Sequence, residues 1–242
     1  MPDRCTFLQM NITSTEIDHE DTPIGRLTLR EYHAETGDSG HEILVDGAFL
    51  MASHGSHSER AMADAAHGLL SREPRDLSVL VGGLGAGHTL RAVLDLPHVA
   101  RVEVVEIGHK VVDWNRRYFT EFNGGAVDDP RVRIHIEDVA DLVARSDGAF
   151  DLILLDVDNG PGWLAAPSNA RLYQPGGLAS CRNALRPGGV LAIWSPHQNA
   201  ELEQALETSF EIWTVSDTTH LGRAADEPPS AIYLASAEVG KN

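Results

Sequence analysis

The stretch LSVLVGGLGAG, Leu77 to Gly87, decides the fold, because an apolar run ends there in three glycines spaced by two, Gly83, Gly85 and Gly87. Glycine is required where the backbone takes a positive φ or comes too close to a ligand for a Cβ. The following AGHTLRAVLDL has the apolar spacing of a helix. The run predicts a strand, a nucleotide-binding turn and a helix, with a purely structural turn as the alternative.

A second apolar run, RVEVVEI at 101–107, predicts the next strand and carries Glu106 near its end. Glu106 follows the glycines by roughly 20 residues, the distance at which such folds place an acid on the two hydroxyls of a ribose. The alternative is an exposed acid at the end of a strand. Together the two features predict an adenosine-containing cofactor.

The spacing of the glycines indicates which cofactor. A dinucleotide fingerprint G-x-G-x-x-G needs glycine at position 88, where the chain has His88. The pattern G-x-G-x-G is complete, and it is typical of enzymes that use S-adenosylmethionine. We therefore expect that cofactor at Gly83, Gly85 and Gly87.

Composition restricts the class of protein. Hydrophobic residues make up 42% and charged residues 23% of the 242 residues, as in a globular domain with a proper core. The chain has no apolar run of membrane-spanning length, and its first residues lack the apolar core of a signal peptide, so we expect a cytoplasmic enzyme with no membrane partner. Cys5 and Cys181 are expected to be reduced thiols.

Charge restricts the ligands. The formal net charge is -17, with 19 basic against 36 acidic residues, which argues against a nucleic-acid partner. The surplus attracts a cationic small molecule or serves only as a solubilising surface. The 12 histidines show no compact ligand spacing, so no metal site is expected.

The first part of the chain, residues 1–55, has strand character and predicts a small N-terminal β-hairpin unit. Asp46-Gly47 joins two apolar runs and predicts a two-residue hairpin turn. Ser56 and Glu59 have the spacing of a capping box, and an alanine-rich helix with Ala61, Ala65 and Leu69 on one face follows. This helix leads into a second domain, residues 56–242.

From residue 76 onward, strand and helix patterns alternate, which is typical of a parallel sheet covered on both faces. We expect strands at 77–83, 101–107, 131–136, 150–156 and 188–194, helices near 86–96, 109–122, 138–145, 175–185 and 198–208, and a closing pair at 210–215 and 230–236. This order predicts an α/β fold with a doubly wound, seven-stranded, methyltransferase-type Rossmann-like sheet.

The chain resembles the spermidine synthase family, the polyamine aminopropyltransferases of the methyltransferase superfamily, over most of its length. The resemblance rests on the order of VVEIGHKVVDWNRRYF, DDPRVRIHIEDVADLV, FDLILLDVDNGPG and LRPGGVLAIW, with DDPRV as its most specific segment. It implies that the three glycines hold the methionine part and ribose, that Glu106 accepts from the ribose hydroxyls, and that Asp138, in the Glu137-Asp138 turn, accepts from the adenine amino group. The alternative for Asp138 is the N-cap of the next helix.

The catalytic positions of the family are kept only in part. Gly85 stands where the family has an acid that pairs with the amine of decarboxylated cofactor. The family loop Asp-Ser-Ser-Asp-Pro is matched by 156–161, DVDNGP, with Asn159 at the second acid. The polyamine-holding tyrosines are replaced by His57 or Ser58 and by Leu178.

Asp156 and Asp158 form the acid pair at the end of the fourth strand, and either one is positioned to orient or deprotonate an acceptor amine. For Asp158 the alternative is an Asx turn. Asn159, Trp163 and His220 are expected in the acceptor pocket, with core packing as the alternative for Trp163.

These features predict an S-adenosylmethionine-dependent transferase, with methyl transfer to a small, amine-bearing, cationic molecule as the main hypothesis. The alternatives are an aminopropyltransferase that uses decarboxylated S-adenosylmethionine and a non-catalytic relative. The resemblance is also compatible with a homodimer that associates through the N-terminal unit.

Overall fold

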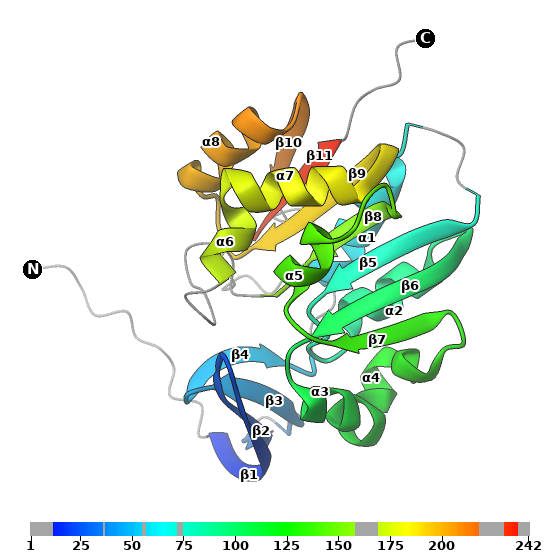
Figure 1. The fold of residues 1–242 in the computed structure, drawn as a ribbon. Coiled ribbons are helices and arrows are strands. Elements are labelled where there is room, and N and C mark those ends of the chain that lie inside the picture. The colour runs from blue at the N-terminus through cyan, green and yellow to red at the C-terminus, as the bar shows by residue number, and fades with distance from the viewer. Residues whose placement is uncertain are drawn as a thin grey trace, which may run out of the picture.

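The computed structural model describes residues 12–35, 37–54, 57–71, 75–157, 169–217 and 230–236. Two sheets organise these residues (Figure 1). A seven-stranded sheet has the order β10-β11-β9-β8-β5-β6-β7, and a four-stranded antiparallel sheet has the order β1-β2-β3-β4. The expected α/β fold with a methyltransferase-type seven-stranded sheet is confirmed.

The large sheet consists of β5 (Leu77–Gly82), β6 (Val99–Glu106), β7 (Val132–Ile136), β8 (Phe150–Leu155), β9 (Leu185–Ser195), β10 (Ile212–Asp217) and β11 (Ala231–Ser236). The five strands from β7 to β9 pair in parallel, whereas β11 pairs antiparallel with β9 and β10. The chain winds outward from β5 to β6 and β7, and then returns to place β8 on the other side of β5. The carboxyl ends of β5 and β8 therefore form the switch point where such sheets bind ligands.

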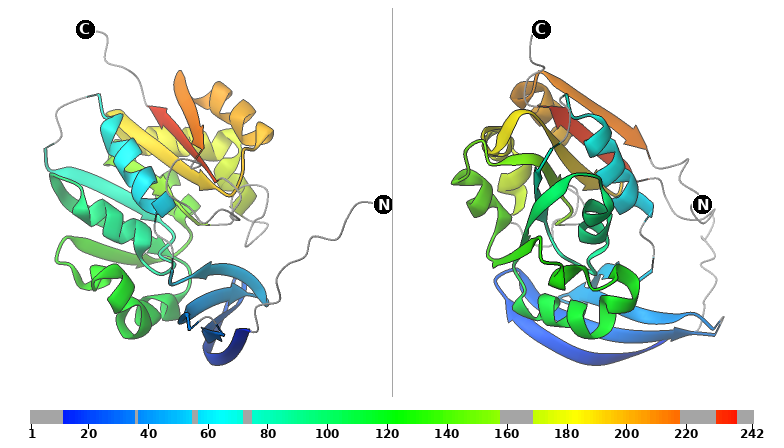
Figure 2. Two further views of the ribbon diagram at one scale, coloured as in Figure 1. Left: turned by 180° about the vertical axis from the view of Figure 1, so that it is seen from behind. Right: turned by 90° about the vertical axis from the view of Figure 1, so that its right-hand side faces the viewer.

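Helices cover both faces of the large sheet (Figures 1 and 2). One face carries α1 (His57–Gly68) and α2 (His88–Asp95), and the other carries α5 (Val139–Ala144) and α7 (Pro175–Ala184). The remaining helices are α3 (His109–Trp114), α4 (Thr120–Asn123), α6 (Ala170–Tyr173) and α8 (Ala200–Ser209). A five-residue π-helical turn, Asn115–Phe119, joins α3 to α4, so the helix expected near 109–122 is interrupted.

The small sheet contains β1 (Ile12–Thr22), β2 (Gly25–Ala34), β3 (Ser39–Val45) and β4 (Ala48–Ala52). The turn between β3 and β4 is the expected one, because Asp46 and Gly47 both have positive φ, 48° and 81°. Strand β1 is an edge strand of mostly polar residues, and no alternation of apolar residues marks it in the sequence.

The two sheets share one hydrophobic core. Leu27, Leu29 and Ile43 of the small sheet belong to the same buried cluster as Val79 of β5 and Leu90 of α2. The shared cluster joins the small sheet to the large one. The division of the chain into a unit of residues 1–55 and a domain of residues 56–242 stays a prediction.

An ionic contact also ties β1 to α3. Asp18 accepts from Lys110 Nζ and, at 3.0 Å, from Trp114 Nε1, while the Lys110 amide donates to Glu20 Oε2 over 2.8 Å. The Lys110 hydrogen bond is the main reason that the pKa of Asp18 falls to about 2. The register of β1 against β2 shifts between Glu16 and Asp18. The shift lies next to the two acids that contact α3, Asp18 and Glu20.

Among the helices that the structure describes, none has the length and apolar character needed to span a membrane.

Candidate functional site

A cavity of about 170 Å³ lies at the carboxyl ends of β5, β6 and β8, under the small sheet. Its polar and charged lining residues are Glu59, His88, Thr89, Glu106, Glu137, Asp138, Asp156 and Asn169. Apolar side chains of the small sheet, Ile24, Leu27, Ile43, Leu50 and Met51, line it from the opposite side. The site is therefore formed between the two sheets, with one wall from each.

The glycine-rich turn forms one wall of this cavity. Gly83, Gly85 and Gly87 all have positive φ, 86°, 50° and 82°, as the spacing predicts. A Cβ on Gly83 would collide with the backbone carbonyl oxygen of Asp156, so this glycine lets β5 and β8 approach each other at the cavity. Gly83 and Gly85 line the cavity, whereas Gly87 is the N-cap of α2 and is not among the lining residues.

Two buried asparagines hold the turn from behind. Asn115 Nδ2 donates to the carbonyl of Gly85 over 2.7 Å, and Asn123 Nδ2 donates to the carbonyl of Ala86 over 2.9 Å. The two side chains also bond to each other over 2.8 Å. The sequence pattern did not predict them, because they come from the π-helical turn and from α4, and only the tertiary fold brings these to the glycines.

Glu106 ends β6 inside the cavity and is buried, so the alternative of an exposed acid is wrong. Its Oε2 accepts from the Leu84 amide over 3.0 Å, and its Oε1 accepts from the Gly108 amide over 2.8 Å. Burial raises the pKa of Glu106, and these amide hydrogen bonds oppose that rise. In this arrangement the carboxylate holds the glycine turn in place, and its contact with a ribose stays a prediction.

Replacing Glu106 by Ala is expected to weaken binding of S-adenosylmethionine or its thioether product by about 1–3 kcal/mol, the usual loss when a buried polar group loses its partner. The Leu84 and Gly108 amides would lose their acceptor, and the ribose would lose the carboxylate. Titration calorimetry measures the effect. Glu103→Gln, on the same strand but paired with His135, is the control and should bind normally. Unchanged affinity in Glu106→Ala would remove this residue from the ligand site.

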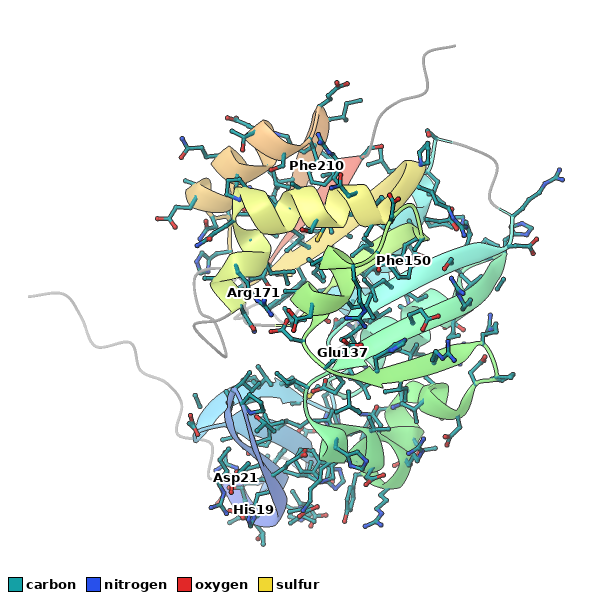
Figure 3. All side chains as sticks on the ribbon, in the orientation of Figure 1. His19, Asp21, Glu137, Phe150, Arg171 and Phe210 are labelled. Atoms are coloured by element: carbon teal, nitrogen blue, oxygen red, sulfur yellow. The ribbon has the colours of Figure 1, made fainter. Side chains whose placement is uncertain are left out.

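The acids that follow β7 are both paired with arginines. Figure 3 labels one member of each pair, Glu137 after β7 and Arg171 on α6. Glu137 accepts from Arg145 over 2.6 Å, which lowers the pKa of Glu137. Asp138 is the N-cap of α5, since its Oδ1 accepts from the Ala140 amide over 2.8 Å, and its Oδ2 accepts from Arg171 of α6 over 2.8 Å. The N-cap role, which was the alternative for Asp138 in the sequence analysis, is therefore confirmed. Asp138 also lines the cavity. Its contact with an adenine stays a prediction.

Asp156 follows β8 directly and lines the cavity. Thr89 Oγ1 of α2 donates to its Oδ2 over 2.7 Å. Burial raises the pKa of Asp156 to about 7, the negative charge of Glu59 adds to the rise, and the Thr89 hydrogen bond opposes it. A carboxyl with a pKa near neutral accepts and releases a proton at working pH, as a general base must. Glu59 and Thr89 were not predicted as site residues.

Four expected site residues, Asp158, Asn159, Trp163 and His220, lie outside the described residues. Leu178 of α7 is fully buried in the core and does not line the cavity, although the resemblance placed it at a polyamine-holding position. Within the described ranges, no group of three or more His, Cys, Asp or Glu side chains is placed to hold a metal ion.

The charged side chains that line the cavity are mainly acidic. Five carboxylates, of Glu59, Glu106, Glu137, Asp138 and Asp156, line it, and no lysine or arginine is among its described lining residues. Arg171 and Arg145 pair with two of these acids, Asp138 and Glu137. Such a site favours a cationic ligand.

Comparisons with known proteins show which family the chain resembles. A model of the spermine/spermidine synthase domain matches residues 60–216. The polyamine aminopropyltransferase of Leptospira biflexa is 34% identical over 158 residues, 65% of this chain and 53% of that protein. Polyamine aminopropyltransferase 2 of Pseudomonas aeruginosa is 30% identical over 164 residues, 66% of this chain and 44% of that protein. The chain thus spans about half the length of these curated relatives.

Solved structures show the same fold. The crystal structure of spermidine synthase from Thermotoga maritima has a TM-score of 0.73 at 23% identity, and the match covers 93% of this chain and 73% of that one. A spermidine synthase in complex with the transition-state analogue AdoDATO gives the same TM-score and identity. The family model and the curated relatives support the aminopropyl alternative better than the main hypothesis of methyl transfer.

Proposed function

Because this chain belongs to the spermine/spermidine synthase family, we propose that it transfers an aminopropyl group from decarboxylated S-adenosylmethionine to the primary amine of a small cationic acceptor. The relatives named above are polyamine aminopropyltransferases. Each match covers only part of this chain and about half of the relative. Aminopropyl transfer and its substrates are therefore proposals for this chain.

The observation that carries the proposal is the charge of the cavity lining. Decarboxylated S-adenosylmethionine has a sulfonium and an ammonium group and no carboxylate, and five acidic side chains line the cavity. S-adenosylmethionine itself adds a carboxylate, for which the described lining offers no lysine or arginine. Electrostatic complementarity therefore favours the decarboxylated form.

Each lining group has a task in this proposal. The turn at Gly83 and Gly85 lets the backbone approach the cofactor, Glu106 accepts from the ribose, and Asp138 accepts from the adenine. The sulfonium supplies an electrophilic methylene carbon with a thioether as leaving group. Asp156 orients the acceptor amine for in-line attack and takes a proton from it, so that the nitrogen lone pair is free.

Methyl transfer from S-adenosylmethionine is the second candidate, and one observation favours it. Gly85 provides no carboxylate to repel that of S-adenosylmethionine, and a Cβ built on Gly85 comes no closer to any heavy atom than 3.8 Å, from Met51. A missing repulsive element widens specificity. This observation leaves room for the larger cofactor, whereas the charge of the remaining lining disfavours it.

Binding and turnover with both cofactors test the proposal. We expect the decarboxylated cofactor to bind at least about tenfold more tightly than S-adenosylmethionine in titration calorimetry, a difference of about 1.4 kcal/mol. We also expect 5′-methylthioadenosine to form when putrescine or another diamine is added, as followed by mass spectrometry.

Two results would contradict aminopropyl transfer. One is a methylated amine with S-adenosylhomocysteine formed from S-adenosylmethionine, and the other is the absence of 5′-methylthioadenosine across a panel of diamines and polyamines. The homodimer and the cytoplasmic location stay predictions.

A further inference from the structure

One backbone amide of the glycine-rich turn, that of Ala86, has no hydrogen-bond acceptor among the described residues. The neighbouring amides of the turn all have an acceptor, which is the Val105 carbonyl for Gly83, the Glu106 carboxylate for Leu84 and Gly85, and the Leu84 carbonyl for Gly87. Ala86 is buried and lines the cavity. Because a buried N–H without an acceptor is rare and costly, the Ala86 amide is suited to donate to a ligand in the cavity.

The peptide between Gly85 and Ala86 is held in one orientation. Leu84 to Gly87 forms a β-turn in which Gly85 has a positive φ of 50° and Ala86 does not, as in a type II′ turn. The Gly85 carbonyl accepts from Asn115 Nδ2 over 2.7 Å. The peptide is planar and trans, so the Ala86 N–H points away from Asn115. Gly85 and Ala86 line the cavity and Asn115 does not, so this geometry turns the N–H toward the cavity.

The side chain that holds this peptide is itself fixed. Asn115 Nδ2 also donates to the Val111 carbonyl over 2.9 Å, and Asn115 Oδ1 accepts from Asn123 Nδ2 over 2.8 Å. Both asparagines are fully buried, and all four of their side-chain N–H groups donate to a partner. A satisfied buried network of this kind keeps a single arrangement. The π-helical turn that begins at Asn115 is a feature often found at functional sites.

We propose that the Ala86 amide donates a hydrogen bond to an oxygen of the cofactor's ribose, and that Asn115 is the positioning residue that turns this amide toward the cavity. This inference rests on the proposed function. The ribose carries every oxygen of decarboxylated S-adenosylmethionine, and the proposed function places it at Glu106, which accepts from the Leu84 amide of the same turn. Loss of Asn115 should therefore weaken binding of the cofactor and leave that of the acceptor unchanged.

An NMR titration of the wild-type chain tests the Ala86 amide. The probe is 5′-methylthioadenosine, which has the ribose and no carboxylate. At saturation we expect the Ala86 amide ¹H signal to move downfield and its hydrogen exchange to slow by about tenfold. The Gly87 amide already has the Leu84 carbonyl as its acceptor, so its exchange should change little and serves as the internal control.

Asn115→Ser tests the positioning role. Serine is too short to reach the Gly85 carbonyl, so we expect affinity for 5′-methylthioadenosine to fall about tenfold or more and the Ala86 shift to be lost. KM for putrescine should stay within about twofold of wild type. Thr120→Val is the matched control, because Thr120 Oγ1 donates to the Asn115 and Arg116 carbonyls of the same π-helical turn. Its affinity for 5′-methylthioadenosine should stay near that of wild type.

Three results would overturn the inference. An Ala86 signal that 5′-methylthioadenosine leaves in place would remove this amide from the ribose. A shift caused by S-adenosylmethionine alone would assign the amide to a carboxylate instead. Equal losses of affinity in Asn115→Ser and Thr120→Val would show that Asn115 only supports the fold. If Asn115→Ser does not fold, the same readouts in Asn123→Ser decide, because that change removes the hydrogen bond that orients the Asn115 amide.

These outcomes are distinguishable from failure of the proposed function. The titrations with 5′-methylthioadenosine need no turnover. Absence of transfer by wild type with every amine would overturn aminopropyl transfer, while the titrations would still decide the roles of Ala86 and Asn115.

Discussion

Replacing Asp156 by Asn is expected to lower the rate of transfer by about 10²–10⁴-fold, the usual contribution of a general base. Asparagine keeps the shape of the side chain and an oxygen that can accept from Thr89, but it cannot take a proton from the acceptor. Affinity for 5′-methylthioadenosine should change little, because the loss falls on the chemical step. Single-turnover transfer and titration calorimetry measure the two quantities.

Asp151, a buried acid near the start of β8, provides the control. Asp151 accepts from the Ser78 amide and from Arg186, both over 2.8 Å, and it is not among the cavity-lining residues. Asp151→Asn should therefore lower the free energy of unfolding while the rate per folded molecule stays near that of wild type. Full activity in Asp156→Asn would remove Asp156 from the chemistry and favour a mechanism in which the pocket only aligns an already neutral amine.

The same variant should be more stable than wild type above neutral pH. The pKa of Asp156 is raised from 3.8 to about 7 in the folded chain, so the folded state keeps a proton that the unfolded state releases. The resulting stabilisation is fully present below about pH 4 and is lost as pH rises toward and through 7. Asp156→Asn has no such dependence, so its advantage in the free energy of unfolding should grow between pH 4 and 8. Urea unfolding at several pH values measures it.

Replacing Gly83 by Ala is expected to lower the free energy of unfolding by about 2–6 kcal/mol and to abolish binding of 5′-methylthioadenosine. The φ of 86° is strained for any L side chain, and the new Cβ would collide with the backbone carbonyl of Asp156. Because the collision is with backbone, relief requires β5 and β8 to separate at the cavity. Urea unfolding and titration calorimetry report the two losses.

Gly85→Ala is the matched control for that variant. Its φ of 50° carries a similar strain, but the nearest heavy atoms to its Cβ are those of Met51 at 3.8 Å. We expect a loss of only about 1 kcal/mol, from the left-handed backbone alone. Equal losses in the two variants would show that the approach of the Asp156 carbonyl is not what requires glycine at position 83.

Local sequence determined the order of the elements in the large sheet. The strands from β5 to β9 are apolar runs, apart from β7, in which apolar and polar residues alternate. Each is followed by a turn and a segment of helical spacing, so the order of strands and helices was readable without tertiary information. The same local logic predicted the positive φ of Gly83, Gly85 and Gly87 and the turn at Asp46-Gly47. It gave strand character to residues 1–55 but did not single out β1, because an exposed edge strand needs no apolar alternation.

The composition of the cavity was decided only by the tertiary structure. Glu106 and Asp156 were predicted because each comes at or just after the end of a parallel strand, and such ends meet at one edge of a sheet. Glu59 and Thr89 come from helices, and which of their faces meets the strand ends depends on long-range packing that no local pattern records. For the same reason Asn115 and Asn123, far from the glycines in sequence, support the glycine turn, and the small sheet provides the opposite wall. Local residue pattern therefore determined the strands and the turn, whereas the packing of helices and of a second sheet determined which charges face the ligand.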